Sequence, residues 1–179
     1  MLDEYSKITP MITAEQLMQH FNLEPLPIEG GHFRQTYQAG ESILGEALPA
    51  RYGRSKVAGT AIVYLLTPAP DSFSALHHLP TDEIYHFYLG DPVELLLLHP
   101  HGRSEQISLG QDILNGQYVQ FVVPRGVWQG SRLMPGGRFA LLGTTMAPGY
   151  DDEDYVGGER EALIAQYPDQ AEQIRQLTR

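Results

Sequence analysis

The sequence predicts an all-β fold, either a sandwich or a barrel built from short strands. From residue 60 to residue 146, short stretches rich in apolar and aromatic residues follow one another at regular spacing. Turn signals that contain Pro, Gly or Asp separate these stretches, and no helical pattern alternates with them. Such spacing is typical of all-β sandwiches and barrels, whereas a parallel sheet would need a helix between successive strands.

A short helix is expected before the first strand. Thr13 is a suitable N-cap, and the side chain of Gln16 can reach back to it, as in a capping box. Leu17 and Phe21 continue the pattern at helical spacing to about Asn22. The two prolines that follow end the helix, because proline has no backbone N–H to donate.

A turn, an exposed segment and a series of strands follow this helix. The turn at residues 29–31 leads into a first strand at residues 33–37, where aromatic and polar residues alternate. Residues 40–58 contain Gly, Pro and Arg, and we expect an exposed loop or hairpin there. Further strands are expected at residues 60–67, 72–79, 83–88, 93–99, 104–109, 118–123 and 138–146.

A helical pattern follows the last strand. An acidic run at residues 151–154, which we expect to be a solvated surface, precedes it. The helix covers residues 159–167 and restarts after Pro168. Four residues form its expected inner face: Leu163, Tyr167, Ile174 and Leu177. No repeat or linker divides the sequence, so we expect one domain over residues 1–179, with a barrel core at about 28–150.

The composition is typical of an ordinary globular protein, and it limits the kinds of partner that the protein is expected to bind. Hydrophobic residues make up 42% of the chain and charged residues 19%. The net charge of -10 opposes binding to nucleic acids, and the absence of cysteine fits a reducing compartment. The first seven residues are acidic and polar, unlike a signal peptide, and no apolar run approaches the roughly 20 residues of a membrane helix. We therefore expect a cytoplasmic protein that binds neither nucleic acids nor membranes.

The first candidate site lies in the segment from residue 74 to residue 90. His77 and Glu83 are six residues apart, so one hairpin can aim an imidazole and a carboxylate into the same cavity. Both groups are common metal ligands and together form a plausible acid/base pair. If Glu83 faces inwards, strand alternation turns Tyr85 inwards too and His86 outwards, unless a bulge shifts the phase. The catalytic candidates are therefore His77, Glu83 and Tyr85.

A second candidate wall lies at residues 124–129, where a Pro-x-Gly turn leads into a strand. Gln129 is either a cavity ligand or a neutral residue that satisfies a backbone group, and Trp128 either stacks on a ligand or packs in a core or interface. Arg34 either clamps an anionic group or pairs with an acidic residue, and the hydroxyl of Tyr64 either enters the cavity or packs. The substrate-binding candidates are Arg34, Tyr64, His86, Trp128 and Gln129.

Two short patterns in these segments resemble the paired motifs of the cupin superfamily. The first cupin motif has His-x-His, then Glu, then Gly, and His77, Glu83 and Gly90 occupy three of those places. The second has Pro-x-Gly, two further residues and a third His, and here Gln129 stands in place of that His. Leu79 stands in place of the second His. The resemblance therefore implies a metal site in which two of the four ligands are replaced.

One branch of the superfamily, the cupin-5 or DUF985 family, resembles the sequence more closely. The resemblance runs from about residue 13 to residue 157. Its motifs occur in order at residues 29–37, 82–87, 90–92, 123–129 and 147–150. It implies a double-stranded β-helix, the cupin jelly roll, here with a short N-terminal helix and a C-terminal helix. It also implies a dimer similar to germins and to the epimerase that makes dTDP-rhamnose precursors, but no particular activity.

Three hypotheses follow for the function. The first is an isomerase or epimerase that acts on a sugar or a sugar-nucleotide-like metabolite, in which His77 moves a proton and Glu83 orients it. Its cofactor is either a divalent metal (Zn, Fe, Mn or Ni), held by His77, Glu83 and Gln129, or none, because proton abstraction beside a carbonyl needs no metal. The second is a non-catalytic module that binds a metabolite or a metal, and the third is a structural dimer. The apolar strand at residues 93–98 favours a homodimer, because an exposed edge strand needs a partner.

Overall fold

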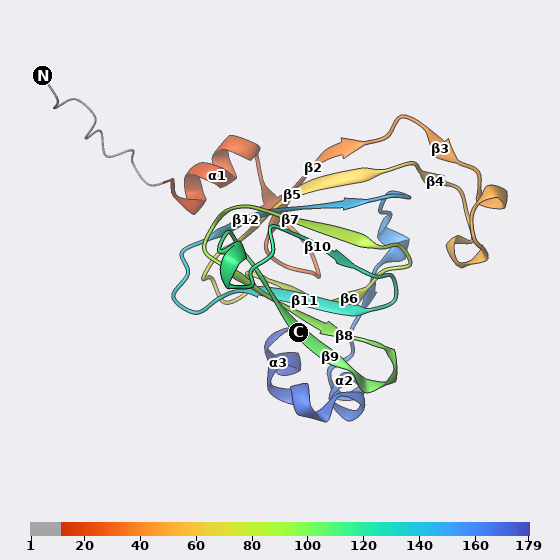
Figure 1. Ribbon diagram of the computed structural model, residues 1–179. Coiled ribbons are helices and arrows are strands. Elements are labelled where there is room, and N and C mark those ends of the chain that lie inside the picture. The colour runs from red at the N-terminus through yellow and green to blue at the C-terminus, as the bar shows by residue number, and fades with distance from the viewer. Residues whose placement is uncertain (1–11) are drawn as a thin grey trace, which may run out of the picture.

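Two antiparallel β-sheets form the body of the protein in the computed structural model, which describes residues 12–179 (Figure 1). The acidic N-terminal residues, on which the expectation of no signal peptide rests, lie outside the described residues. The first sheet has the order β1 (Glu24–Pro25), β2 (His32–Gln38), β5 (Thr60–Leu66), β12 (Ala140–Met146), β7 (Glu83–Gly90) and β10 (Gln120–Val123). The second has the order β13 (Val156–Gly157), β6 (Phe73–His78), β11 (Trp128–Leu133), β8 (Val93–Leu98) and β9 (Ser104–Leu109).

The chain crosses repeatedly between the two sheets. β5, β7, β10 and β12 belong to the first sheet, whereas β6, β8, β9 and β11 belong to the second. The neighbours within a sheet therefore come from distant parts of the sequence, and β12 lies between β5 and β7. This is the topology of a jelly roll. It confirms the prediction of an all-β double-stranded β-helix.

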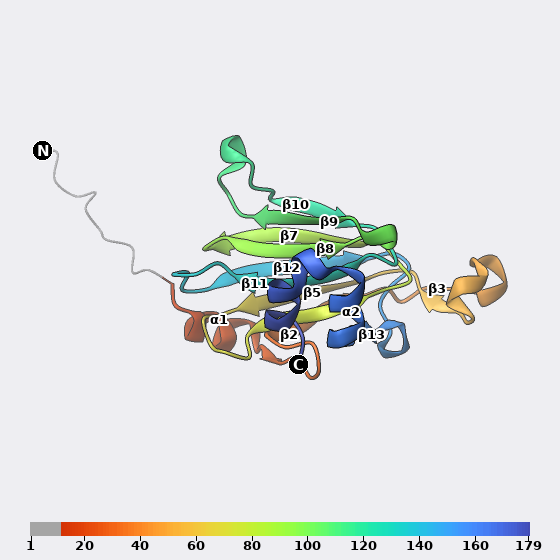
Figure 2. The ribbon, with the colours of Figure 1, turned by 90° about the horizontal axis from the view of Figure 1, so that it is seen from below.

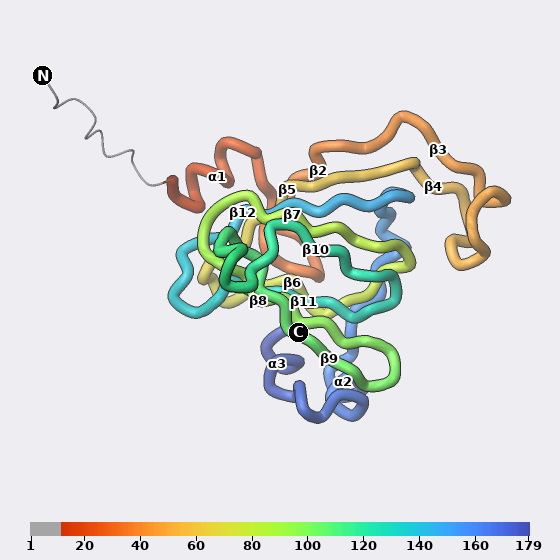
Figure 3. The backbone as a smooth tube through the Cα atoms, viewed as in Figure 1, coloured from red at the N-terminus to blue at the C-terminus, as the bar shows by residue number. Residues whose placement is uncertain are grey.

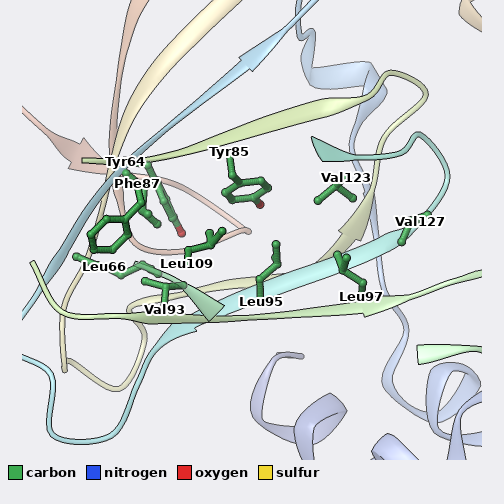
Figure 4. Packing of buried hydrophobic residues seen from close by; sticks show 12 residues of the cluster. Tyr64, Leu66, Tyr85, Phe87, Val93, Leu95, Leu97, Leu109, Val123 and Val127 are labelled. Atoms are coloured by element: carbon green, nitrogen blue, oxygen red, sulfur yellow. The ribbon is translucent and has the colours of Figure 1, made fainter. Parts of the chain in front are cut away.

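Apolar side chains from both sheets fill the space between them (Figure 4). Leu66, Phe87 and Leu142 come from the first sheet, and Leu95 and Leu97 come from β8 in the second. Each of the five is at most 6% exposed. This core fixes the distance between the sheets, so the side chains that face the remaining interior space are held on rigid strands.

Helices cover parts of the outer faces of both sheets (Figure 2). Helix α1 (Ala14–Phe21) packs Leu17 against Leu65 and Leu141 on the first sheet. Thr13 and Gln16 form the expected capping box, with Thr13 N–H donating to Gln16 Oε1 at 3.0 Å and Gln16 N–H to Thr13 Oγ1 at 3.3 Å. The predicted start of this helix is confirmed.

The C-terminal helices α2 (Arg160–Gln166) and α3 (Ala171–Gln176) lie against the second sheet. The four predicted inner-face residues of this region are buried against Leu76, Leu96 and Leu98 of that sheet: Leu163, Tyr167, Ile174 and Leu177. The longest helix in residues 12–179 has eight residues, and none of these helices is long and apolar enough to cross a membrane.

Residues 40–58 form an arm that leaves the body after β2 and returns to it at β5 (Figure 3). Strands β3 (Ser42–Ile43) and β4 (Lys56–Val57) pair in it, as the expected hairpin requires. The remaining short elements are 3₁₀ turns, at Gly45–Ala47, Ala50–Tyr52, Pro100–Gly102, Ile113–Asn115, Asp152–Asp154 and Pro168–Gln170.

Two expectations from the sequence are wrong. Strand β8 is not an exposed edge, because it lies between β11 and β9 with the core on one face and the C-terminal helices on the other. It therefore gives no support to a dimer. The acidic run is also not wholly solvated: Asp154 is 5% exposed and pairs with buried Lys56 of β4, while partly buried Arg54 reaches Asp151, Glu153 and Asp154.

Candidate functional site

A cavity of about 510 Å³ opens where β5 and β7 begin and β6 and β12 end. Tyr64, His77, Glu83 and Tyr85 line it, together with Arg34 nearer its mouth. The first four come from three different strands of the two sheets and are each at most 7% exposed. The fold therefore brings together five of the residues predicted from the sequence.

His77 presents one defined ring nitrogen as a base. Its Nδ1 lies 2.7 Å from the carbonyl oxygen of Ala75, which only accepts hydrogen bonds, so Nδ1 carries the proton and donates it. The Nε2 atom of the neutral ring then has a free lone pair. The ring of Tyr155 stacks on the imidazole, with the centroids 5.0 Å apart and the planes at 21°. His77 is thus held in one tautomer and one orientation.

Gln129 links His77 to Glu83. It faces His77 across the pairing of β11 with β6, and its Nε2 donates to Glu83 Oε2 at 2.7 Å. The same Nε2 lies 3.5 Å from His77 Nε2, which is a long and weak contact. Glu83 Oε2 accepts in this bond, so a proton on the Glu83 carboxyl would lie on Oε1. The Oε1 atom of Gln129 is buried and has no hydrogen-bond partner in the described part of the chain.

Burial raises the pKa of the Glu83 carboxyl above its ordinary value, and nearby Glu29 adds to the rise. His77, when its ring is protonated, and hydrogen bonds from Thr144 and Gln129 act in the opposite direction without cancelling it. Glu83 therefore holds its proton to a higher pH than a solvated carboxyl, and in that form it can donate a hydrogen bond into the cavity.

Two tyrosines line the cavity between the sheets (Figure 4). Burial raises the pKa values of Tyr64 and Tyr85 well above the ordinary value, so both hydroxyls stay protonated. Tyr64 uses its proton within the fold, since Oη donates to the carbonyl oxygen of Gly30 at 2.9 Å. Tyr85, as the strand alternation predicted, faces inwards next to Glu83. Its hydroxyl is a neutral group that interacts with Ser74 at the cavity wall.

Three of the substrate-binding candidates do not line the cavity: Gln129, which lies behind His77 and Glu83, and His86 and Trp128, which lie farther away. His86 is on the outer face of the first sheet, where Nε2 lies 3.1 Å from Thr145 Oγ1 and the ring stacks on Tyr88. Trp128 meets His78 edge-on at 4.4 Å and packs beside the C-terminal helices. Because Gln129 faces inwards, strand alternation turns its neighbour Trp128 outwards. Neither the His86 nor the Trp128 side chain lines this cavity.

Arg34 lines the cavity, but its guanidinium is also engaged at the surface. Its Nη1 lies 3.6 Å from Glu24 Oε1, and 52% of the Arg34 side chain is exposed. Both alternatives considered for this residue, a place at the site and an ion pair, are thus observed together.

Glu29 is a site residue that was not predicted from the sequence. It lines the cavity, and its Oε1 accepts a hydrogen bond of 2.6 Å from Ser74 Oγ. Gly30 and Gly31 follow it with φ values of +106° and +67°, and a Cβ atom on Gly31 would lie 2.5 Å from Tyr64 Oη. The two glycines let the turn pass close to Tyr64 and point Glu29 inwards. An acidic residue before a Gly-Gly turn was the only signal available.

The metal site implied by the cupin resemblance does not fit the residues present. Among residues 12–179 no group of three His, Cys, Asp or Glu side chains is placed to hold a metal ion. Leu79 lines the cavity in place of one ligand, and Gln129 turns a hydrogen-bond donor towards Glu83 and His77. An amide NH₂ group has no lone pair for a metal. The reaction that we propose for this site therefore does not use a metal ion.

Comparison with known proteins agrees with this architecture. Residues 15–156 match the family described as Cupin superfamily (DUF985), Cupin_5. Uncharacterized protein YML079W of Saccharomyces cerevisiae is 29% identical over 180 residues, which cover 94% of this chain and 85% of that protein. Protein SO0799 of Shewanella oneidensis has a TM-score of 0.82 at 28% identity, with 94% of this chain and 99% of that chain covered.

Two further structures show how far the fold extends. A hypothetical protein from Leishmania major has a TM-score of 0.82 at 26% identity, with 93% of this chain and 99% of that chain covered. Oxalate decarboxylase from Bacillus subtilis has a TM-score of 0.51 at 15% identity, with 88% of this chain and 37% of that chain covered, which shows a shared fold alone. The family match covers most of the chain, and so the protein belongs to the DUF985 (Cupin_5) family of the cupin superfamily.

Proposed function

We propose that the protein is an isomerase or epimerase that moves a proton at a carbon next to the carbonyl group of a sugar-like metabolite. The hydrogen bond from His77 Nδ1 to the Ala75 carbonyl carries this proposal, because it leaves Nε2 unprotonated on a buried, oriented ring beside the cavity. A general base must have a free lone pair within reach of the substrate. The lining favours a sugar over a sugar nucleotide, since acidic side chains outnumber basic ones in the cavity and would repel phosphates.

The proposed reaction uses three side chains. His77 Nε2 takes the proton from the carbon, and the electron pair of the broken C–H bond moves towards the carbonyl oxygen. Glu83 in its protonated form, or the Tyr85 hydroxyl, donates a hydrogen bond to that oxygen and stabilises its developing charge. Gln129 holds the Glu83 carboxyl in place through the 2.7 Å hydrogen bond. For isomerisation, Glu83 gives its proton to the former carbonyl oxygen and takes the proton of the neighbouring hydroxyl, while His77 returns its proton to the former carbonyl carbon, so that the carbonyl group moves by one position. For epimerisation, a proton must instead reach the opposite face of the same carbon from a donor across the cavity, and His77 releases its proton to solvent.

Solvent deuterium exchange tests this proposal. The protein is incubated in D₂O with a panel of aldoses, ketoses and their amino derivatives, and proton NMR follows the signals beside each carbonyl. We expect deuterium to enter at least one compound, with a rate at least about 100-fold lower for His77→Gln. His20→Gln, on the exposed face of α1, is the matched control and should exchange like the wild type. No exchange with any compound, or equal exchange by His77→Gln, contradicts the proposal.

One observation favours a second function, a non-catalytic binding module. The Gln129 amide donates to Glu83 and approaches His77 Nε2, so the three side chains also satisfy one another. A binding module would show a ligand-induced rise in the thermal unfolding midpoint, without exchange, that survives His77→Gln. An enzyme would show both binding and exchange.

A further inference from the structure

The cavity is lined by an excess of negative charge. Four carboxylates line it, those of Glu24, Glu29, Glu83 and Asp152, against the single guanidinium of Arg34. Arg34 pairs with Glu24, whose side chain is 72% exposed. In the described part of the chain no Lys or Arg side chain pairs with the other three acids. Because burial favours the protonated form of Glu83, the negative charge left for a ligand to meet is mainly that of Glu29 and Asp152.

Glu29 is the best placed of these acids to bind a cation. Its backbone is anchored by the Ala75 N–H, which donates to the Glu29 carbonyl oxygen at 2.8 Å. Its carboxylate is oriented by Ser74 Oγ through Oε1 at 2.6 Å. Within residues 12–179 no other hydrogen bond reaches that carboxylate, which leaves Oε2 to accept from a ligand. A carboxylate oriented in this way can accept strong hydrogen bonds from a charged group with several N–H donors, such as an ammonium group.

Aromatic rings complete the same wall. Phe33, Tyr64, Tyr85 and Tyr150 line the cavity together with Glu29. The face of an aromatic ring attracts a cation within about 6 Å of its centroid, and partial burial strengthens the attraction. The pKa of Tyr150 is raised by burial and then by the charge of Asp152, so that ring too remains a neutral phenol. Carboxylates and aromatic rings around one hollow are the combination that binds organic ammonium ions.

We infer that the ligand of this cavity carries a primary ammonium group, bound by Glu29 and the surrounding aromatic rings, while its carbonyl end faces His77. This rests on the proposed small-molecule role of the cavity, and it narrows the substrate class to amino sugars. Phosphorylated and carboxylated metabolites are disfavoured, because they would bring a further negative charge among unpaired carboxylates.

Matched hexoses test the inference. Glucosamine, galactosamine and mannosamine are compared with their neutral parent hexoses and with the hexose 6-phosphates, by calorimetry and thermal shift. We expect at least one amino sugar to bind at least about tenfold more tightly than its parent hexose, and the phosphate to bind most weakly. The preference should shrink as salt is added, because screening weakens charge interactions.

The variant Glu29→Gln removes the negative charge of the side chain and keeps its size and shape. Glutamine keeps an oxygen for Ser74, so the variant should fold, which its thermal midpoint without ligand verifies. It should lose the preference for the amine, whereas Glu172→Gln, on the exposed side of α3, should keep it. Equal or tighter binding of a neutral or phosphorylated hexose, no binding of any amino sugar, or an unchanged preference in Glu29→Gln overturns the inference.

The outcomes also separate this inference from the proposed reaction. Amine-selective binding without deuterium exchange would remove the proton-transfer role of His77 and leave the ligand class intact. Exchange on a neutral hexose, without any preference for its amino derivative, would exclude the ammonium ligand and leave the proton-transfer role of His77 intact.

Discussion

Glu83 is a buried carboxyl group that faces the cavity. It is 7% exposed, lines the cavity and has no ion pair with Lys or Arg in residues 12–179. Burial raises the pKa of its carboxyl in the folded state. Between the unfolded and the folded pKa, the folded protein binds more protons than the unfolded chain. The free energy of unfolding therefore falls as pH rises through that window.

Replacing Glu83 by glutamine should remove this pH-dependent cost. Glutamine cannot ionise and still offers an oxygen to Gln129 Nε2. We expect Glu83→Gln to be more stable than the wild type at about pH 8, with the difference closing towards about pH 4, where both side chains are neutral. Urea unfolding at a series of pH values measures it. A variant less stable than the wild type at pH 8 would show instead that the charged carboxylate stabilises the fold.

At the scale of single residues, local rules predicted part of the site. Strand alternation placed His77, Glu83 and Tyr85 inwards and His86 outwards, because side chains of one strand alternate whatever its partners are. The same rule excludes Trp128 once Gln129 faces inwards. Glu29 could not be predicted in this way. It reaches the cavity only because the turn at Gly30 and Gly31 packs on Tyr64, 34 residues away from Gly30.

At the scale of elements, the loop after β12 is joined to the arm by a buried ion pair. Lys56 of β4 and Asp154, at the end of a 3₁₀ turn, are both at most 5% exposed and bond to one another. Asp154 Oδ2 also accepts from the Asp151 N–H at 3.1 Å. The turn between them includes Asp152, which lines the cavity. The ion pair therefore positions one wall of the site.

Lys56→Met should destabilise the protein strongly. It leaves the Asp154 carboxylate buried without its main partner, and breaking such a pair costs about 3 kcal/mol in the free energy of unfolding. Arg175→Met, which breaks an exposed pair with Glu172 on α3, is the control and should cost about 0.5 kcal/mol or less. Urea unfolding measures both. Similar small losses in the two variants would mean that the Lys56 pair is not structurally important.

Elements that depend on neighbouring residues were predictable, and those that depend on distant ones were not. The capping box at Thr13 and Gln16 involves residues three apart, so the sequence alone indicates it. The partner of Asp154 is 98 residues away. Nothing in the acidic run distinguishes Asp154 from its exposed neighbours until β4 is placed beside it.

At the scale of the whole molecule, the homodimer remains a prediction, with a different surface from the one first considered. Strand β8 is buried, whereas the outer face of the first sheet beyond α1 exposes Tyr88 and Val122, which are 46% and 47% exposed. His86 lies beside them, with its ring parallel to that of Tyr88. Exposed aromatic and apolar side chains on a rigid sheet suit a self-complementary contact about a twofold axis.

Light scattering after size-exclusion chromatography tests this prediction, because it measures the molecular mass of the protein in solution. We expect the wild type to have twice the 20.0 kDa mass of one chain. Val122→Lys should give monomers, because a lysine would be buried without a partner in the contact. Val156→Lys changes an equally exposed valine on β13, at the edge of the other sheet, and should remain dimeric. A monomeric wild type, or the same mass for both variants, would refute this interface.

The proton on the His77 ring provides the most direct test of the account, because the proposed chemistry depends on an unprotonated Nε2. Long-range proton–nitrogen NMR, with His77 assigned by its absence in His77→Gln, reports which nitrogen carries the proton in the neutral ring. The account predicts a proton on Nδ1, donated to Ala75, and a lone pair on Nε2 whose signal moves when a ligand binds. A proton on Nε2 would leave the cavity without its base and contradict the account.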